Sequence, residues 1–425
     1  MISGKIEGDS VEYFVGKRMK ARYEQVQCFS REEMERRFCE VREAMDEESV
    51  DVLFILEGYW EGYSQWLIGD AGAEIVVVPL DGPITACYGD HYIKEGEKYD
   101  REIDPNYTVM SLPVEPVHED IRYVRGFSGY EVRKQLKGYE KAVIGFVHLE
   151  SLRADLKEYL SEIFPRAEYR DISLAIDVRK AVKSAEEQVM IRNAVSIHEK
   201  VMAALPAYIM PGRTIRQIDS QTRKLCHDLG SGGSSCICSV MQYGKDEEGP
   251  LTYQSGLKEY PQRPLERGDR IFMMLEANGI GGHFTAIGRN FCLGEPDEKI
   301  REYWDAAVKM QDFAAGMLRP GVTVREIFEE NVRYIESMGY QTNQQNYLHS
   351  FGYVFGEKPY LHDESEKMPL RENMIYVNHP HVSIDRGKNT GKALYDTLFA
   401  FDTYLVAKEG GIIQNKVPRS LFVIE

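Results

Sequence analysis

Cysteines are the side chains that could bind a metal or act as nucleophiles, judged by residue type and spacing alone. The chain has seven, and two of them stand one residue apart in Cys236-Ile237-Cys238. That spacing is too tight for the usual zinc knuckle, and no second cysteine pair follows at metal-binding spacing. An odd number of cysteines over a long chain is typical of reduced thiols. The sequence therefore predicts a cytoplasmic protein without a disulfide framework.

The composition excludes several classes of partner. The chain has 425 residues, of which 43% are hydrophobic and 28% charged, the ordinary globular mixture. Its 52 Lys and Arg against 68 Asp and Glu give a formal net charge of −16. An acidic surface repels phosphate backbones and anionic lipids, so we expect neither nucleic acid nor a membrane as partner. No run reaches about 18 apolar residues, and the first residues lack the apolar core of a signal peptide.

The first 178 residues alternate stretches typical of strands with stretches typical of helices. Strands separated by helices favour an α/β layer with some parallel pairing. The predicted elements are a helix over 31–46, strands over 50–56, 74–79 and 141–147, an amphipathic stretch over 150–163, and an extended piece near Tyr169.

The second half of the chain contains an internal repeat. Residues 211–218 (Pro-Gly-Arg-Thr-Ile-Arg-Gln-Ile) recur as residues 320–327 (Pro-Gly-Val-Thr-Val-Arg-Glu-Ile), with five identities in eight positions. In each copy a Thr stands three residues before a Gln or Glu, which is the capping-box spacing at a helix start. The pairs are Thr214 with Gln217 and Thr323 with Glu326.

Each copy of this motif follows a long helical stretch, 184–205 in the first case and 297–318 in the second. The helices that the motif opens are predicted to stop at Gly230 and Gly339, because glycine is the usual residue after a helix C-terminus. A unit used twice predicts a pseudo-symmetric domain, although two ordinary helix hairpins would also produce the pattern. A cleft between two halves is a natural small-molecule site.

Several segments resemble the aminopeptidase P, prolidase and creatinase superfamily, peptidase family M24. They are the lead-in at 178–187, the two Pro-Gly-x-Thr turns, and segments 265–269, 285–291, 349–352 and 369–380. The resemblance implies an α/β (α+β) protein, with a smaller N-terminal α/β domain over 1–178. It also implies a pita-bread domain over 179–425, in which two αβ halves enclose a curved antiparallel sheet, and a homodimer.

The metal-dependent members of that family hold two divalent cations with two Asp, one His and two Glu. Two hard cations need several carboxylates to balance their charge. The matching positions in this sequence are Glu276 (in preference to Leu275), Ala286, His349, His379 and Phe401. One carboxylate would leave such a centre badly undercompensated, so the sequence predicts no binuclear site and no metal cofactor.

The family's metal-free branch is creatinase, which uses a His base with two Glu partners. The segment that aligns with that base is 242–251, and it contains no His. The two Glu positions fall on Gly288 and His379. Creatine is therefore disfavoured as the substrate, and the run Asp246-Glu247-Glu248 is typical of a solvated loop.

Glu276, His349 and His379 remain as the candidate catalytic residues. A carboxylate beside imidazoles can orient one ring, raise its basicity and let it move a proton near neutral pH. We expect His349 to be the principal acid/base and the other two to orient it or stabilise charge. Alternatively, each closes a hydrogen bond in a buried sheet, or the three bind a single Fe or Zn ion as a two-His, one-carboxylate site.

Five further residues are candidate substrate-binding groups: His283, Arg289, Tyr353, Glu357 and His381. Arg289 could clamp a substrate carboxylate or form a structural ion pair. His381 lies two residues from His379, so on one strand the two would share a face. Tyr353 and Glu357 could line the cleft or belong to the surface.

Three functions remain open from the sequence. The leading hypothesis is a metal-independent hydrolase that cleaves a C–N bond in a small amino-acid-like or guanidino compound. The second is an Xaa-Pro dipeptidase or aminopeptidase that uses metal. The third is a non-catalytic homologue that uses the fold to bind a partner.

Overall fold

A computed structural model of the chain describes most of the 425 residues. The described residues are 29–56, 62–69, 72–97, 118, 120–136, 138, 141–231, 237–244, 250–254, 263–279, 281–340, 348–353, 356–359, 361, 363–379, 381–383 and 397–425. Cys236 and the acidic run 246–248 lie outside them.

The N-terminal part is built on a mixed sheet. In the described residues its strand order is β4 (Ile121–Phe127), β3 (Ile84–Tyr92), β2 (Ile75–Pro79), β1 (Val52–Leu56), β5 (Val143–Val147) and β6 (Glu168–Asp171). β1 pairs with β5 and β5 with β6 in parallel, which confirms the predicted parallel pairing. The helices predicted over 31–46 and within 150–163 are confirmed. The helical elements are α2 (Arg31–Glu47), α3 (Tyr63–Ile68), α4 (Gly129–Gln135), η2 (Leu149–Ser151), α5 (Ala154–Ile163) and α6 (Ser173–Lys180).

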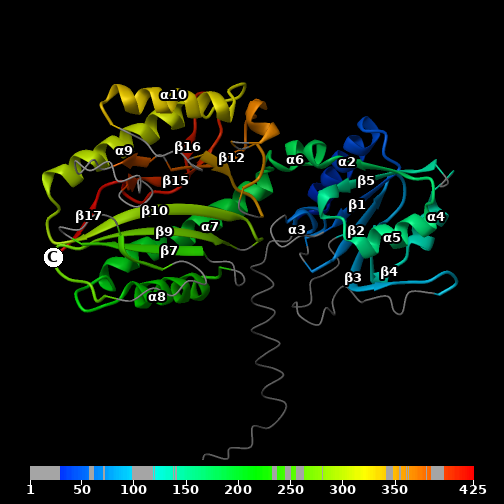
Figure 1. Ribbon diagram of the computed structural model, residues 1–425, viewed down its shortest axis with the longest axis horizontal. Helices are drawn as coiled ribbons and strands as arrows, with labels where there is room; N and C mark the ends of the chain where they lie inside the picture. Colours follow the sequence, from blue (N-terminus) through cyan, green and yellow to red (C-terminus); the bar gives the residue numbers. More distant parts are fainter. Residues whose placement is uncertain are drawn as a thin grey trace, which may run out of the picture.

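The C-terminal part contains a larger, mainly antiparallel sheet beside the first (Figure 1). Its described strands run in the order β11 (Leu348–Ser350), β12 (Ile375–Asn378), β15 (Phe401–Leu405), β10 (Phe284–Leu293), β9 (Arg270–Asn278), β7 (Ile237–Tyr243) and β8 (Pro250–Gln254). β16 (Ile412–Ile413) pairs with β15 and β17 (Phe422–Ile424) with β10, while β13 (His381–Ser383) and β14 (Thr397–Phe399) form a separate pair.

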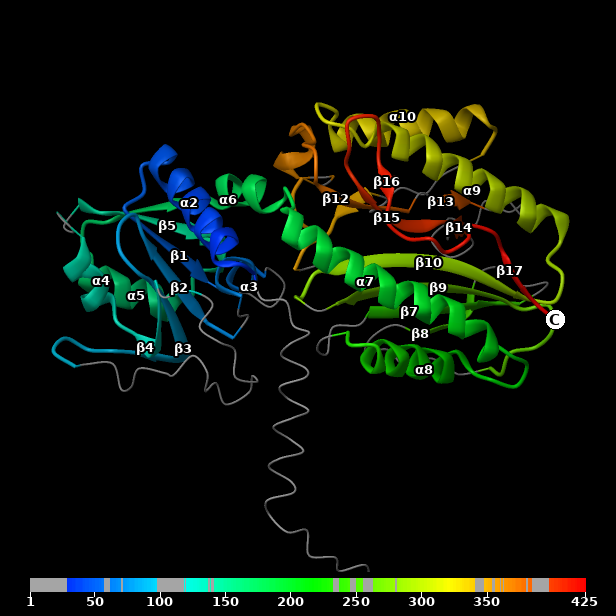
Figure 2. The ribbon, with the colours of Figure 1, turned by 180° about the vertical axis from the view of Figure 1, so that it is seen from behind.

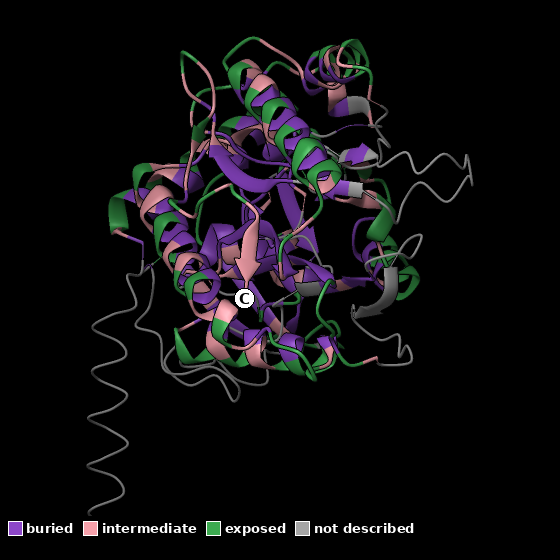
Figure 3. Cartoon of the chain, turned by 90° about the vertical axis from the view of Figure 1, so that its left-hand side faces the viewer, coloured by how far each residue is buried: buried purple, intermediate pink, exposed green. Residues whose placement is uncertain are grey.

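Helices cover one face of this sheet (Figure 2). They are α7 (Ala185–Ala204), η3 (Leu205–Ala207), α8 (Ile215–Asp228), α9 (Glu298–Met317), α10 (Val324–Ser337) and η4 (Glu364–Lys367). The strands lie in the buried interior, and the helices around them expose their outer faces (Figure 3). This architecture matches the pita-bread structures described below.

The repeat predicted from the sequence is a repeat in three dimensions. Both capping boxes form, and both helices are followed by glycines with positive φ: Gly230 at +99° and Gly339 at +83°. The turns before the two helices also make the same bonds, because each pairs with a leucine through two backbone hydrogen bonds. These join residues 212 and 213 with Leu265, and residues 321 and 322 with Leu370.

The pairing register assigns residues of the large sheet to two faces. Leu275 and Ile287 pack in a core with residues of α7 and α8, and Tyr376 and Tyr404 in one with α9. This is the helix-covered face. The strand pairing and the strand period of two assign a second set of residues to the opposite face, here called the inner face. These are Met274, Glu276, Ala286, Gly288, Phe401, Thr403, Val377 and His349.

Candidate active site

His349 lies on β11 and points to the inner face, because it pairs with Val377. Its Nδ1 lies 3.3 Å from the carbonyl oxygen of Ser350. A carbonyl only accepts, so Nδ1 carries the hydrogen and Nε2 of the neutral ring keeps its lone pair. Burial lowers the pKa of His349 to about 4. The ring is therefore an unprotonated proton acceptor at neutral pH.

His379 directly follows β12 and is the second imidazole of the inner face. Its ring stacks on the ring of Phe401 at 4.4 Å between centroids and lies 5.1 Å from the ring of His349. The residue is 6% exposed. The sheet thus brings the two predicted histidines together through adjacent strands β11 and β12.

Glu276 lies on β9, on the same inner face, with three strands between β9 and β11. The order is β9, β10, β15, β12, β11, and no hydrogen bond between described residues joins the carboxyl to either imidazole. Glu276 is 7% exposed, and burial raises its pKa to about 8. It is a neutral carboxylic acid at pH 7, and it does not orient His349 as the sequence analysis expected.

Apolar groups occupy the centre of the inner face between these candidates. A Cβ on Gly288 would lie 2.6 Å from Cβ of Phe401 and 3.2 Å from ring atoms of Phe272, so these two side chains fill the space above that glycine. Ala286 has a backbone N–H that donates to the Thr403 hydroxyl at 3.0 Å, and the hydroxyl lies 3.0 Å from the Ala286 carbonyl oxygen. Both of these contacts of the Thr403 hydroxyl are therefore with the backbone of the sheet.

The donors on this face do not fit a pair of divalent cations. Ala286, Gly288 and Phe401 offer no ligand atom, and the one carboxyl is held neutral by burial. Across the described residues, no group of three His, Cys, Asp or Glu side chains is placed to hold a metal ion. The two-His, one-carboxylate set is likewise divided between β9 and the β11–β12 edge.

Arg289 does not face a ligand on this side of the sheet, so the predicted carboxylate clamp is wrong. It follows Gly288, and strand alternation turns its side chain to the helix-covered face. There its Nη2 lies 2.8 Å from Asp402 Oδ1, and its guanidinium also donates to the carbonyls of Phe401 and Pro418. Both charged side chains are fully buried. The alternative of a structural ion pair is the arrangement observed.

His283 and Tyr353 are buried where α2 of the N-terminal part meets α7. Their polar atoms reach the same carboxylate oxygen of Glu187, at 3.5 Å from His283 Nε2 and 3.3 Å from the Tyr353 hydroxyl. Arg37 of α2 lies 3.4 Å from that oxygen. Burial favours a raised pKa for Glu187, but the neighbouring cations outweigh it and hold the pKa well below its ordinary value. These groups have structural partners, so the substrate-binding role predicted for them is not supported.

Glu357 is likewise committed to a buried ion cluster. Its carboxylate bonds Lys180 at 2.6 Å and also Lys183, from the segment that joins the two parts of the chain. Burial would raise the pKa of Glu357, yet the two ammonium groups lower it to about 2. The prediction that Glu357 lines the ligand cleft or the surface is therefore wrong.

His381 does not continue the strand that precedes His379. β12 ends at Asn378, and His381 begins β13, which pairs with β14 in a separate two-stranded sheet. The argument for a shared face required one continuous strand, so it fails here. The side chain of His381 lies outside the described part of the structure.

Two residues that contribute to the geometry were missed by the sequence analysis. Glu187 is the fourth residue of the pattern Ser184-x-x-Glu187, a capping box that forms at the start of α7. That signal predicts its position at the helix start but not its contacts with the N-terminal part. Thr403 follows Phe401 by two residues, so strand alternation alone could have placed it on the inner face.

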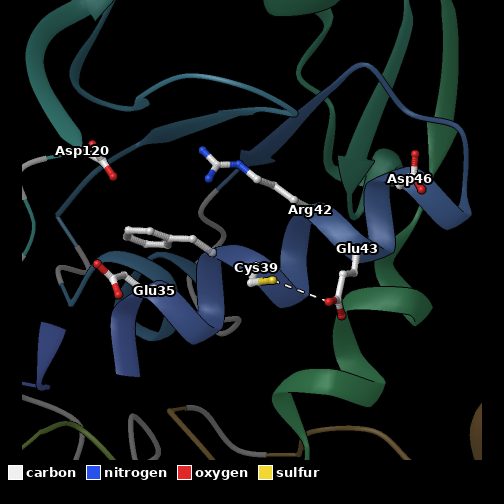
Figure 4. A pocket seen from close by; sticks show the side chains of 7 residues that line it. Glu35, Cys39, Arg42, Glu43, Asp46 and Asp120 are labelled. Atoms are coloured by element: carbon white, nitrogen blue, oxygen red, sulfur yellow. Dashed lines mark hydrogen bonds between the residues drawn. The ribbon is translucent and has the colours of Figure 1, made fainter. Parts of the chain in front are cut away.

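The N-terminal part has a hollow of its own, of about 420 Å³, on the outer side of α2. Figure 4 shows four carboxylates around it and Cys39 between them, with the thiol 3.5 Å from Glu43 Oε1. That hydrogen bond raises the pKa of Cys39, which disfavours the thiolate form. The hollow belongs to a different part of the chain from the imidazole pair.

The C-terminal part of the chain matches a known protein family. The model of metallopeptidase family M24 matches residues 189–408. The chain belongs to metallopeptidase family M24. Membership places it among peptidase- and creatinase-like hydrolases and confirms the resemblance read from the sequence.

Known relatives of this M24 protein have different activities. Creatinase from Bacillus sp. (strain B-0618) is 25% identical over 71% of this chain and 70% of its own length. Xaa-Pro dipeptidase from Pyrococcus horikoshii is 22% identical over 89% of this chain and 96% of its own. The crystal structure of X-Pro aminopeptidase from Thermotoga maritima is 18% identical, with a TM-score of 0.69 over 91% of this chain and 99% of that one, and confirms the pita-bread fold. Within the described residues, no helix has both the length and the apolar character to cross a membrane.

Proposed function

We propose that this M24 protein is a metal-independent hydrolase that cleaves a C–N bond in a small amino-acid-like or guanidino compound. The observation that carries the proposal is the inverted order of two pKa values on the inner face. Burial sets the pKa of His349 at about 4 and that of Glu276 at about 8. Opposite pKa shifts of this kind let one face of the sheet present a proton acceptor and a hydrogen-bond donor at the same pH. At pH 7 the imidazole accepts and the carboxyl donates.

The proposed reaction uses the two groups on opposite ends of a substrate that spans the inner face. Nε2 of His349 takes a proton from water as the water oxygen bonds to the carbon of the scissile C–N bond. As that bond breaks, the leaving nitrogen takes the electron pair and a proton from the His349 imidazolium, which restores the neutral ring. The Glu276 carboxyl, at the other end of the substrate, donates a hydrogen bond to a substrate oxygen away from the bond that breaks. His379, beside His349, would hydrogen-bond the oxygen on which charge develops.

The composition of the inner face supports a reaction without a cation pair. Aromatic and small side chains stand at the central positions, where two cations would require carboxylates. A neutral carboxyl in a largely apolar setting also strengthens any hydrogen bond that a substrate makes there. We further propose that the enzyme is cytoplasmic and homodimeric, as the family resemblance implies.

The test is elemental analysis of the purified protein together with a panel of guanidino, amide and dipeptide compounds. We expect less than stoichiometric metal, turnover that survives a chelator, and a loss of about 10²–10⁴-fold in kcat for His349→Ala, the range for a general acid/base. Full turnover by His349→Ala would disprove the role of His349. Partner binding that persists in His349→Ala and His379→Ala, without turnover of any compound, would favour a non-catalytic homologue.

The second candidate is a metal-dependent Xaa-Pro dipeptidase. Its support is the Pyrococcus horikoshii relative, whose match covers 96% of that protein. This alternative predicts stoichiometric divalent metal, loss of activity with a chelator, and cleavage of Xaa-Pro dipeptides. Recovery of those three properties would replace the metal-independent proposal.

A further inference from the structure

Gln311 of α9 is a fully buried amide on the helix-covered face, directly behind the imidazole pair. Its Nε2 donates to the carbonyl oxygen of Asn378 at 3.2 Å and to Asp402 Oδ2 at 2.9 Å. Its Oε1 accepts from Arg419 Nη1 at 3.0 Å. Because Arg419 can only donate, this last bond fixes which end of the amide is oxygen. Both hydrogens of the amide nitrogen are therefore used by acceptors on β12 and β15.

The Asn378 carbonyl belongs to the peptide group that links Asn378 to His379. β12 ends at Asn378, and the paired register with β15 ends there too, at Asp402. The Asn378 side chain makes a return bond, since its Nδ2 donates to the backbone carbonyl of Gln311 at 2.9 Å. The Gln311 side chain thus bonds the peptide from which His379 emerges, and the Gln311 backbone bonds the side chain of the preceding residue.

We propose that Gln311 is a positioning residue that fixes the orientation of the His379 ring. It does so through the peptide plane and touches neither imidazole. The His379 ring in turn lies 5.1 Å from His349, so a change in its orientation also changes the surroundings of the base. The catalytic consequence rests on the proposed hydrolase function, whereas the effect on ring orientation does not.

The test replaces the amide by a side chain of similar length, Gln311→Met, in protein labelled with ¹³C at histidine Cε1. Variants lacking His349 or His379 assign the two signals. We expect the His379 signal to shift or broaden and the His349 signal to shift with it. With a turned-over compound, we expect kcat to fall about tenfold and KM to stay within about twofold, because misplacement acts on the reaction step.

The matched control is Asn331→Leu on the neighbouring helix α10. Asn331 is a fully buried amide whose polar atoms have no partner in the described structure. The Asn331→Leu substitution should leave both histidine signals in place. Arg419→Met is the second test variant: it keeps Gln311 but removes the donor that fixes the amide, and Arg419 is half-buried, so folding should survive. We expect a smaller shift of the His379 signal.

Wild-type histidine signals in both Gln311→Met and Arg419→Met would overturn the proposal, and so would an equal shift in Asn331→Leu. Absence of any turnover, with shifted histidine signals, would instead remove the hydrolase function and leave the positioning role of Gln311 intact.

Discussion

Two buried carboxyl groups on opposite faces of the large sheet have opposite surroundings. On the helix-covered face, the Asp402 carboxylate accepts hydrogen bonds from Arg289, Gln311 and Asn415 at 2.7–2.9 Å. On the inner face, the Glu276 carboxyl of β9 is also buried, but no donor among the described residues bonds it. The first carboxyl group has a cation and two further donors beside it, and the second is driven by burial toward its neutral form.

This difference distinguishes side chains that stabilise the sheet from side chains suited to proton transfer. A buried polar group with every bond satisfied contributes to alignment and is expected to do little else. A buried titratable group without partners has a displaced pKa, which is common at functional sites. Arg289, a residue type suited to substrate binding, belongs to the first kind, and Glu276 belongs to the second within the described residues. His349 combines the two, because its Nδ1 bonds Ser350 while burial lowers its pKa to about 4.

The largest expected effect is loss of the Arg289–Asp402 pair. Arg289→Met removes the guanidinium and leaves Asp402 charged and buried, so we expect the free energy of unfolding to fall by about 3–5 kcal/mol. Urea-induced unfolding measures it. The control is Arg301→Ala, because its pair with Glu295 is largely exposed and should contribute less than about 1 kcal/mol. Equal losses in the two variants would mean that the buried network has no special structural role.

The next effect is the pH dependence of stability that Glu276 contributes. Its pKa is raised to about 8 in the folded protein, so the folded state binds a proton that the unfolded state has lost. Stability from this group is therefore present below pH 4.5 and is lost as pH rises toward 8. Between pH 6 and pH 8, the wild type should lose about 2 kcal/mol relative to Glu276→Gln, which cannot ionise. Parallel unfolding curves for the two proteins at both pH values would contradict the raised pKa.

Much of the fold follows from local signals in the sequence. The two capping boxes, the glycine stops and the helices near 184–205 and 297–318 are all observed, because they depend on residues three to four positions apart. The placement of His349 beside His379 also agrees with the resemblance read from the sequence. The position of the His349 and His379 pair follows from strand alternation, which sets the face of each side chain, and from the pairing of neighbouring strands.

The errors come from contacts between distant parts of the chain. Glu357 meets Lys180 and Lys183 across more than 170 residues, and Arg289 meets Asp402 across 113. No local pattern encodes such partners. The argument that His379 and His381 share one strand face fails for a different reason: the strand stops at Asn378, and spacing in the sequence does not reveal that break.

A smaller effect, on the pH dependence of turnover, tests the acid and base assignment. Because His349 must be unprotonated and Glu276 protonated, kcat/KM should fall tenfold per pH unit below about 4 and above about 8. Glu276→Gln should lower the plateau and abolish the alkaline limb. An alkaline limb that persists in Glu276→Gln would assign that pKa to another group.

The smallest effect tests whether burial, and not hydrogen bonding alone, determines how much the network on the helix-covered face contributes to the free energy of unfolding. Thr214 and Thr323 each accept a hydrogen bond from a backbone N–H at the start of a helix, but these caps lie near solvent. Water can replace a lost bond there, so Thr214→Ala and Thr323→Ala should each lower the free energy of unfolding by about 1 kcal/mol. The two values should agree, because the turns before the helices make the same backbone bonds. A loss in either variant as large as that of Arg289→Met would show that bonding alone, without burial, sets the cost.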